Sequence, residues 1–208
     1  MIPSKYGDAT VLGEIASEAD LKAVWDLDNA TNDRLLAARG LLPGIERSEL
    51  VSGMAHSDII NAAFTHAHPL GARFSGPARG AWYAGFDIAT AQAEVAFHKT
   101  VQLSEINYFH DSVTYDDYLS DLLGDYYDLR IGARSFAKCL DPDSYVESQK
   151  LGARLLRGGA LGIVYPSVRF ARGTSIVCFR PAGVANVRKG ETYRFSWSGQ
   201  TKPAISLG

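Results

Sequence analysis

Two apolar runs near the C-terminal end of the chain place the strongest constraint on its fold. They read IVYPSV over Ile163–Val168 and SIVCFR over Ser175–Arg180. Both runs are short and rich in β-branched residues, which is typical of buried strands, and Pro166 interrupts the first. Such strands have to be covered by other elements, so the rest of the chain decides the fold class.

Three longer segments have the spacing of helices, at residues 17–39, 88–99 and 144–158. Asp87 is a candidate N-cap for the second helix. Ser144 and Glu147 resemble a capping box at the start of the third. The segment Ser57–Phe64 is either a short helix or an irregular approach to the following turns.

Further strands are expected in three regions. The aromatic run Ala81–Phe86 has the length and composition of a strand, and alternation extends in places over Glu105–Tyr118. Short edge strands are expected at Val184–Val187 and Tyr193–Trp197. Three interpretations of the acidic, aromatic run Asp116–Asp128 remain open, namely a surface helix, a strand edge and a partner contact.

Strands and helices are interleaved without a regular βαβ period, which predicts the α+β class. We expect a single compact domain with a mixed β-sheet core flanked by helices. Residues 1–55 are predicted to form a helical extension packed on a domain that spans residues 56–208.

Composition excludes several classes of protein. The 208 residues include 21 Lys and Arg against 23 Asp and Glu, a net charge of −2, so nothing favours direct nucleic-acid binding. Cys139 and Cys178 are far apart, which argues against a disulfide framework and a metal site. The start of the chain has no signal-peptide pattern, and no apolar run is long enough to span a membrane. A cytoplasmic protein is expected.

The stretch GARFSGPARGAWYAGFDIATAQAEVAFHKT, from Gly71 to Thr100, gathers residue types that suit a ligand site. Arg73 lies in a glycine-bearing loop, where a guanidinium can bind phosphate or remain a surface side chain. Tyr83 can stack on a flat ring or fill the core. Trp82 should face the other side of its strand.

The acid in this stretch is the sharpest signal. Glu94 stands among small and apolar residues, and a buried glutamate requires a partner. His98 follows four residues later on the same helix face, so a solvated contact between the two is the alternative. Ser167 ends an apparent strand, where its hydroxyl could contact a ligand or its own backbone.

In order and spacing, GARFS, Tyr83 with TAQAEVAFH, and GIVYPSVR resemble the RES-domain family, named for its arginine, glutamate and serine. The resemblance covers most of Asn61–Arg180. It implies a fold similar to ADP-ribosyltransferases and a toxin of a type II toxin–antitoxin pair that consumes NAD+ as a substrate, without a cofactor. One departure is that Phe74 and Ser75 follow the arginine where shorter members have Trp-Asn.

The resemblance also implies roles for individual residues. Glu94, Arg73 and Ser167 would be catalytic, with Glu94 stabilising positive charge on the ribose and Arg73 holding the pyrophosphate or the ribose. Tyr83 would contact nicotinamide or its ribose, Ser167 would fix the nicotinamide end, and His98 and His56 are looser candidates for NAD+ binding.

The partners implied are NAD+, an Xre-like helix-turn-helix antitoxin and, where the reaction modifies protein, a protein acceptor of ADP-ribose. Hydrolysis and phosphorolysis of NAD+ both remain open. One alternative is a mono-ADP-ribosyltransferase that modifies a metabolic enzyme of the host. The other is a non-enzymatic binding module on the same scaffold.

Overall fold

The computed structural model describes residues 1–4 and 44–208. Its strands form two four-stranded sheets, one in the order β1-β3-β7-β8 and the other in the order β2-β6-β5-β4. The first sheet consists of β1 (Ile2–Pro3), β3 (His110–Leu122), β7 (Val184–Ser198) and β8 (Ala204–Leu207). The second consists of β2 (Trp82–Gly85), β6 (Thr174–Cys178), β5 (Gly162–Pro166) and β4 (Tyr127–Asp128).

All strand pairs are antiparallel except β4 and β5, which run parallel, so the second sheet is mixed. The three strands predicted from the apolar and aromatic runs are confirmed as β5, β6 and β2. With helices between and around the sheets, the α+β class is confirmed. The expected likeness to ADP-ribosyltransferases stays a prediction.

The prediction of two short edge strands after residue 184 is wrong. Both segments belong to β7, a single strand that lies inside its sheet, paired with β3 on one side and β8 on the other. Its register with β3 runs from Val184 opposite Leu122 to Ser198 opposite His110. Pairing on both sides satisfies the backbone of the polar middle of β7, whose composition alone favours a turn.

The helices are α4 (Ser57–Thr65), α5 (Ile88–Glu105) and α6 (Val146–Arg157), with short 3-10 turns at Arg47–Glu49, Ala133–Leu140 and Pro181–Gly183. Asp87 caps α5 as predicted, accepting hydrogen bonds from the backbone N–H and the hydroxyl of Thr90. The helix expected at residues 17–39 lies outside the described residues.

Two boundaries differ from the prediction. Helix α5 continues to Glu105 because Leu103 buries itself against Tyr115 and Phe195, so β3 begins only at His110. The capping box predicted at Ser144 is wrong, since Tyr145 occupies the N-cap position of α6 without a side-chain hydrogen bond.

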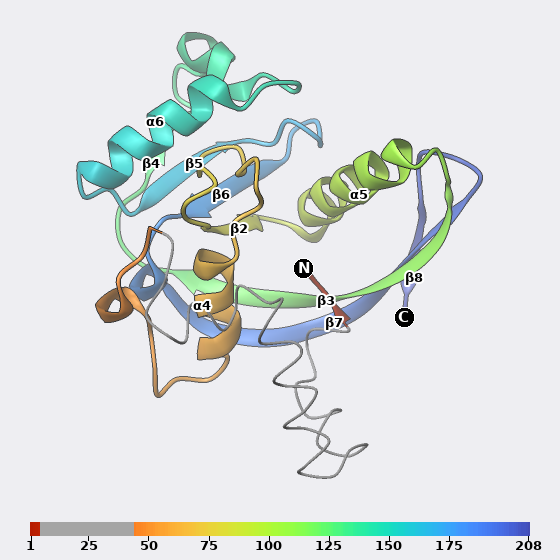
Figure 1. The fold of residues 1–208 in the computed structure, drawn as a ribbon, viewed down its shortest axis with the longest axis horizontal. Helices are drawn as coiled ribbons and strands as arrows, with labels where there is room; N and C mark the ends of the chain where they lie inside the picture. Colours follow the sequence, from red (N-terminus) through yellow and green to blue (C-terminus); the bar gives the residue numbers. More distant parts are fainter. Residues whose placement is uncertain (5–43) are drawn as a thin grey trace.

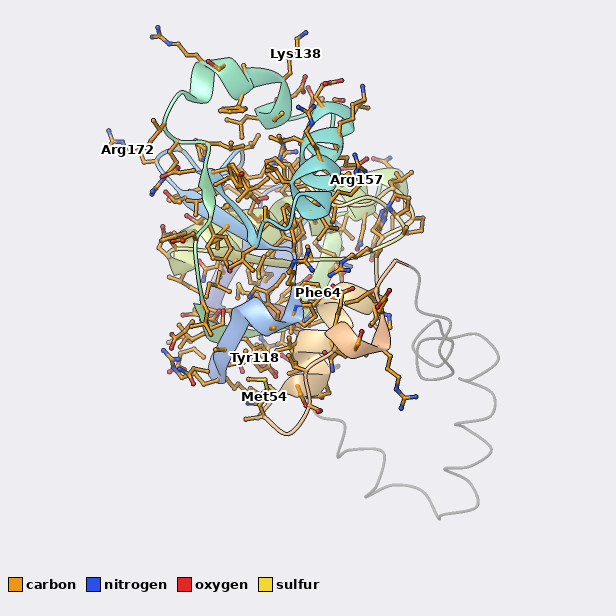
Figure 2. The ribbon with its side chains drawn as sticks, turned by 90° about the vertical axis from the view of Figure 1, so that its left-hand side faces the viewer. Met54, Phe64, Tyr118, Lys138, Arg157 and Arg172 are labelled. Carbon is orange, nitrogen blue, oxygen red and sulfur yellow. The ribbon has the colours of Figure 1, made fainter. Side chains whose placement is uncertain are left out.

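Figure 1 shows the long pair β3 and β7 as a curved band beneath the molecule, with α4 and α5 over one face of it and α6 on the far side of the second sheet. One apolar cluster joins α4 to this band through Phe64, Tyr118 and Val187. Figure 2 shows Phe64 and Tyr118 near each other, toward the end of the molecule away from Lys138 and Arg157. A second cluster, around Phe74 and Tyr165, packs under α6.

The run at residues 116–128 is not a surface helix. Its first part continues β3, where Asp116 and Tyr118 are buried, and its last part forms β4. Asp116 accepts hydrogen bonds from Ser4 and Thr192, and this ties the first residues of the chain to β3.

Arg79 has a structural role. Its guanidinium donates to both carboxylate oxygens of Glu49, at 2.8 and 2.9 Å, and to the carbonyls of Gly44 and Phe179. These bonds fasten the segment after residue 43 to the second sheet. Within the described residues, none of the helices is both long and apolar enough to cross a membrane.

Candidate functional site

A cavity of about 630 Å³ lies between the two sheets and beneath α5. This volume is in the range of small-molecule sites. Four of the predicted site residues line it, namely Arg73, Tyr83, Glu94 and His98. Helix α5 comes close to β2 because the residues between them are small, and a Cβ on Gly85 would lie only 2.8 Å from the backbone nitrogen of Ala91.

The loop that carries Arg73 is fixed by its backbone. Gly71 has a φ of +70°, and a side chain there would collide with the Ser75 carbonyl, so this turn requires glycine. Arg73 is only 7 % exposed, and its Nη1 donates to the carbonyls of Asp141 at 2.7 Å and Cys139 at 3.3 Å. Its guanidinium carbon lies 4.8 Å from the centre of the Tyr145 ring, a cation–π contact.

Both backbone bonds of Arg73 use Nη1. In the described part of the chain, the Nε and Nη2 groups of the guanidinium donate no further hydrogen bond. Two backbone carbonyls thus hold the side chain in place, and because Arg73 also lines the cavity, its remaining N–H groups are candidates to bind an anion or a hydroxyl there.

Tyr83 supports this loop. Its hydroxyl oxygen accepts a hydrogen bond from the backbone N–H of Phe74 at 3.0 Å and lies 3.1 Å from Ser75 Oγ. Burial raises the pKa of Tyr83 to about 12, so the phenol stays neutral. Trp82 packs with the cluster on the opposite side of β2, as predicted, yet both rings contribute to the cavity wall.

Glu94 is the carboxylate of the cavity's α5 wall, and Ser167 is its hydrogen-bond partner. The Ser167 hydroxyl donates to Glu94 Oε1 at 3.0 Å and accepts from the backbone N–H groups of Arg169 and Phe170. Of the two roles left open for this serine, the local backbone turn is therefore confirmed, and contact with a ligand stays a prediction. Ser167 is not among the residues that line the cavity, and it reaches the cavity through Glu94.

The pKa of Glu94 is set by two opposite influences, burial and nearby positive charge. Burial raises the pKa of Glu94, while the Ser167 hydrogen bond and the positive charges of Arg169 and Arg73 lower it, and the net direction is upward. Burial and the same two arginines lower the pKa of His98, so this imidazole is neutral at pH 7. The site thus combines a carboxylate that resists ionisation with a neutral histidine.

His56 stands apart from the other predicted residues. It occupies the N-cap position of α4, and its ring meets Tyr118 edge-on with 5.6 Å between ring centres. Tyr118 lines the cavity and His56 does not. A direct role in NAD+ binding, which the sequence suggested, has no support from this position.

Sequence reasoning missed three residues of the site. Tyr145 lies against Arg73, and Tyr165 is a fully buried wall residue whose ring packs edge-on to Phe74 at 4.8 Å. Arg169 stacks on the Phe97 ring at 3.3 Å and donates to the Pro142 carbonyl. Tyr165 and Arg169 were both recoverable as members of GIVYPSVR, whereas Tyr145 carries no local signal.

The described residues were also compared with the requirements of a metal site. Within residues 1–4 and 44–208, no group of three or more His, Cys, Asp and Glu side chains is close enough to hold a metal ion. Cys139 and Cys178 are both free thiols.

The geometry defines a cavity of small-molecule size that is lined by the partly buried Glu94 carboxylate, by Arg73 and by several aromatic side chains. The family model of the RES domain matches residues 50–198, and the chain belongs to this family. The family is associated with toxin–antitoxin systems and with NAD-utilising enzymes. A comparison with curated proteins finds no match to the chain.

Proposed function

We propose that this protein is an NAD+-consuming toxin that cleaves the bond between nicotinamide and ribose. One observation carries the proposal. The Glu94 carboxylate lines a cavity of small-molecule size, accepts a hydrogen bond from the Ser167 hydroxyl, and shares that cavity with Arg73. Family membership supports NAD as the class of substrate.

The chemistry needs a carboxylate more than a nucleophile. As the bond from the ribose C1′ to the nicotinamide nitrogen breaks, its electron pair moves to that nitrogen and neutralises the pyridinium. Positive charge then develops on the ribose as an oxocarbenium-like state, which a carboxylate next to C1′ stabilises. The interaction is strong in a site from which water is largely excluded.

Because nicotinamide leaves as a neutral molecule, the leaving group needs no proton from an acid. Water attacks C1′ to give ADP-ribose, and the proton it loses passes to the solvent. Phosphate attacks to give the 1″-phosphate of ADP-ribose. A protein side chain in the same place would make the enzyme a mono-ADP-ribosyltransferase.

The other residues of the site bind and orient. The Nε and Nη2 edge of Arg73 would hold a diphosphate oxygen or a ribose hydroxyl. The rings of Tyr83 and Tyr145 would flank nicotinamide or its ribose. Ser167 has a single proton, which goes to Glu94, so we assign it the role of positioning this carboxylate. Contact between Ser167 and nicotinamide stays a prediction.

The decisive variant is Glu94→Gln, with Glu105→Gln as its matched control, because Glu105 is an exposed residue at the far end of the same helix. Purified wild type and E105Q should release nicotinamide from NAD+, and E94Q should lose at least about 100-fold of this activity. E94Q should remain folded, because the raised pKa means that ionisation of Glu94 at neutral pH costs stability in the folded state.

Chromatography of the products, with and without phosphate and with cell protein added, identifies the acceptor. In cells, wild type should arrest growth unless an Xre-like antitoxin is expressed with it, and E94Q should not. Wild-type protein that leaves NAD+ intact with every acceptor would refute the proposal, as would an E94Q variant of full activity.

A further inference from the structure

A β-bulge in β7 lies opposite a second carboxylate of the cavity, that of Asp117 on β3. Asp116 pairs with Thr192 and Tyr118 pairs with Lys189, so the single residue Asp117 faces two residues of β7, Gly190 and Glu191. Bulges bend and twist a sheet locally and are frequent next to functional sites. Here Tyr115 and Tyr118 both face the core, and Asp117 lines the cavity that also holds Glu94.

Asp117 also lines a second cavity of about 510 Å³. The two cavities share Ala84, Gly85, Ala91, Asp117 and Tyr118, so they adjoin next to Asp117. Glu94 and Arg73 line only the first cavity. A ligand that reacts beside Glu94 and is longer than one nucleoside therefore has room to extend past Asp117.

The chemistry of a carboxylate limits what it can contact on a dinucleotide. It repels a diphosphate and accepts hydrogen bonds from hydroxyl groups, and a ribose diol offers two of them side by side. Acidic residues that bind the adenosine ribose in this way favour NAD over NADP, whose 2′-phosphate they repel. Asp87, the other carboxylate of the second cavity, is already used by Thr90.

We infer that Asp117 is a specificity-determining residue. Its carboxylate accepts hydrogen bonds from the hydroxyl groups of the adenosine ribose and repels a 2′-phosphate. This inference rests on the proposed function. The enzyme therefore discriminates between two dinucleotides that are identical at their reactive nicotinamide ends.

A purely structural role for Asp117 would be to anchor the first residues of the chain. The Met1 amino group interacts electrostatically with this carboxylate, and Met1, Ile2 and Pro3 line the same cavity. That anchor already has its own bonds, because Ile2 and Pro3 pair with β3 and Ser4 donates to Asp116. Loss of an anchor would lower the stability of the protein and affect its activity on both substrates equally. Loss of a specificity residue would instead change the ratio of kcat/KM for NADP+ and NAD+.

The test compares Asp117→Asn with Asp121→Asn, a control on the same strand that is exposed and outside both cavities. Nicotinamide release from NAD+ and from NADP+ is measured as kcat/KM for each protein. We expect wild type and D121N to prefer NAD+, and D117N to shift the ratio toward NADP+ by at least about tenfold, the usual weight of a charge-assisted hydrogen bond.

An unchanged NADP+/NAD+ ratio in active D117N would overturn the inference and leave the proposed function standing. If neither dinucleotide is cleaved by wild type, the proposed function fails, and calorimetry with ADP-ribose and its 2′-phosphate decides on Asp117 separately. In that case, wild-type preference for ADP-ribose that D117N loses would support the inference, and equal affinities would overturn it. A fall in melting temperature without a change of ratio would assign Asp117 to anchoring alone.

Discussion

Ser167→Ala tests how the site controls the charge on its carboxylate. The change removes the hydroxyl that donates to Glu94 Oε1 at 3.0 Å and leaves the other stabilising influences, the charges of Arg169 and Arg73, in place. A hydrogen bond to a charged group commonly contributes about 1.5–3 kcal/mol. Its loss therefore shifts the protonation equilibrium of the carboxylate by roughly 10- to 100-fold toward the neutral acid.

The assay is kcat/KM for nicotinamide release as a function of pH. Because burial raises the pKa of Glu94, wild-type activity should fall on the acid side at a higher pH than an ordinary glutamate would give. In S167A this acid limb should move to still higher pH. Well above the limb, where Glu94 is ionised in both proteins, only the lost orientation of the carboxylate should still lower the activity of S167A, so its deficit relative to wild type should be smallest there.

Ser112→Ala is the matched control, because Ser112 is an exposed serine on β3. Within the described residues, its hydroxyl forms a hydrogen bond only with the hydroxyl of Ser196. Its pH profile should match that of wild type. An S167A profile with the wild-type acid limb would refute the reasoning. A loss of activity that is constant at every pH would instead favour direct contact between Ser167 and the substrate.

Two further predictions concern the support of the Arg73 loop. Tyr83→Phe removes a buried hydroxyl that accepts from the Phe74 N–H, so the free energy of unfolding should fall by about 1–3 kcal/mol in urea titration, and an unchanged midpoint would contradict the bond. Gly152→Ala should also destabilise the protein, because the alanine Cβ would overlap the Phe74 carbonyl. This overlap should outweigh the helix propensity of alanine, which exceeds that of glycine by about 1 kcal/mol. Gly76→Ala, which meets nothing within 4 Å, should leave the thermal midpoint unchanged, and equal midpoints for G152A and G76A would argue against the close packing of α6.

Local signals in the sequence predicted the elements that carry their own pattern. The apolar runs gave β5 and β6, the aromatic run gave β2, and Asp87 marked the start of α5. Non-local pairing was not predictable in the same way. The whole of β7 forms because β3 and β8 pair with it, and its polar middle has no strand signal of its own.

The same distinction applies to the site. Arg73, Tyr83, Glu94 and His98 could be predicted from one contiguous stretch, and the structure gathers them around one cavity. Tyr145 could not, because its contact with Arg73 depends on how α6 docks on the sheet. Asp117 was hidden in an acidic run, since only the pairing of β3 with β7 reveals a bulge.

The short strand β1 makes the first residues of the chain part of the sheet and of the cavity wall. Ile2 and Pro3 are fixed on β3 and Ser4 on Asp116, while Gly44 is held by Arg79 on the second sheet. The first residues of the chain are thus held on one sheet, and Gly44 is held beside the other. Because Met1, Ile2 and Pro3 also line the cavity, a truncation from the N-terminus removes part of the site although it lies far from Glu94 in the sequence.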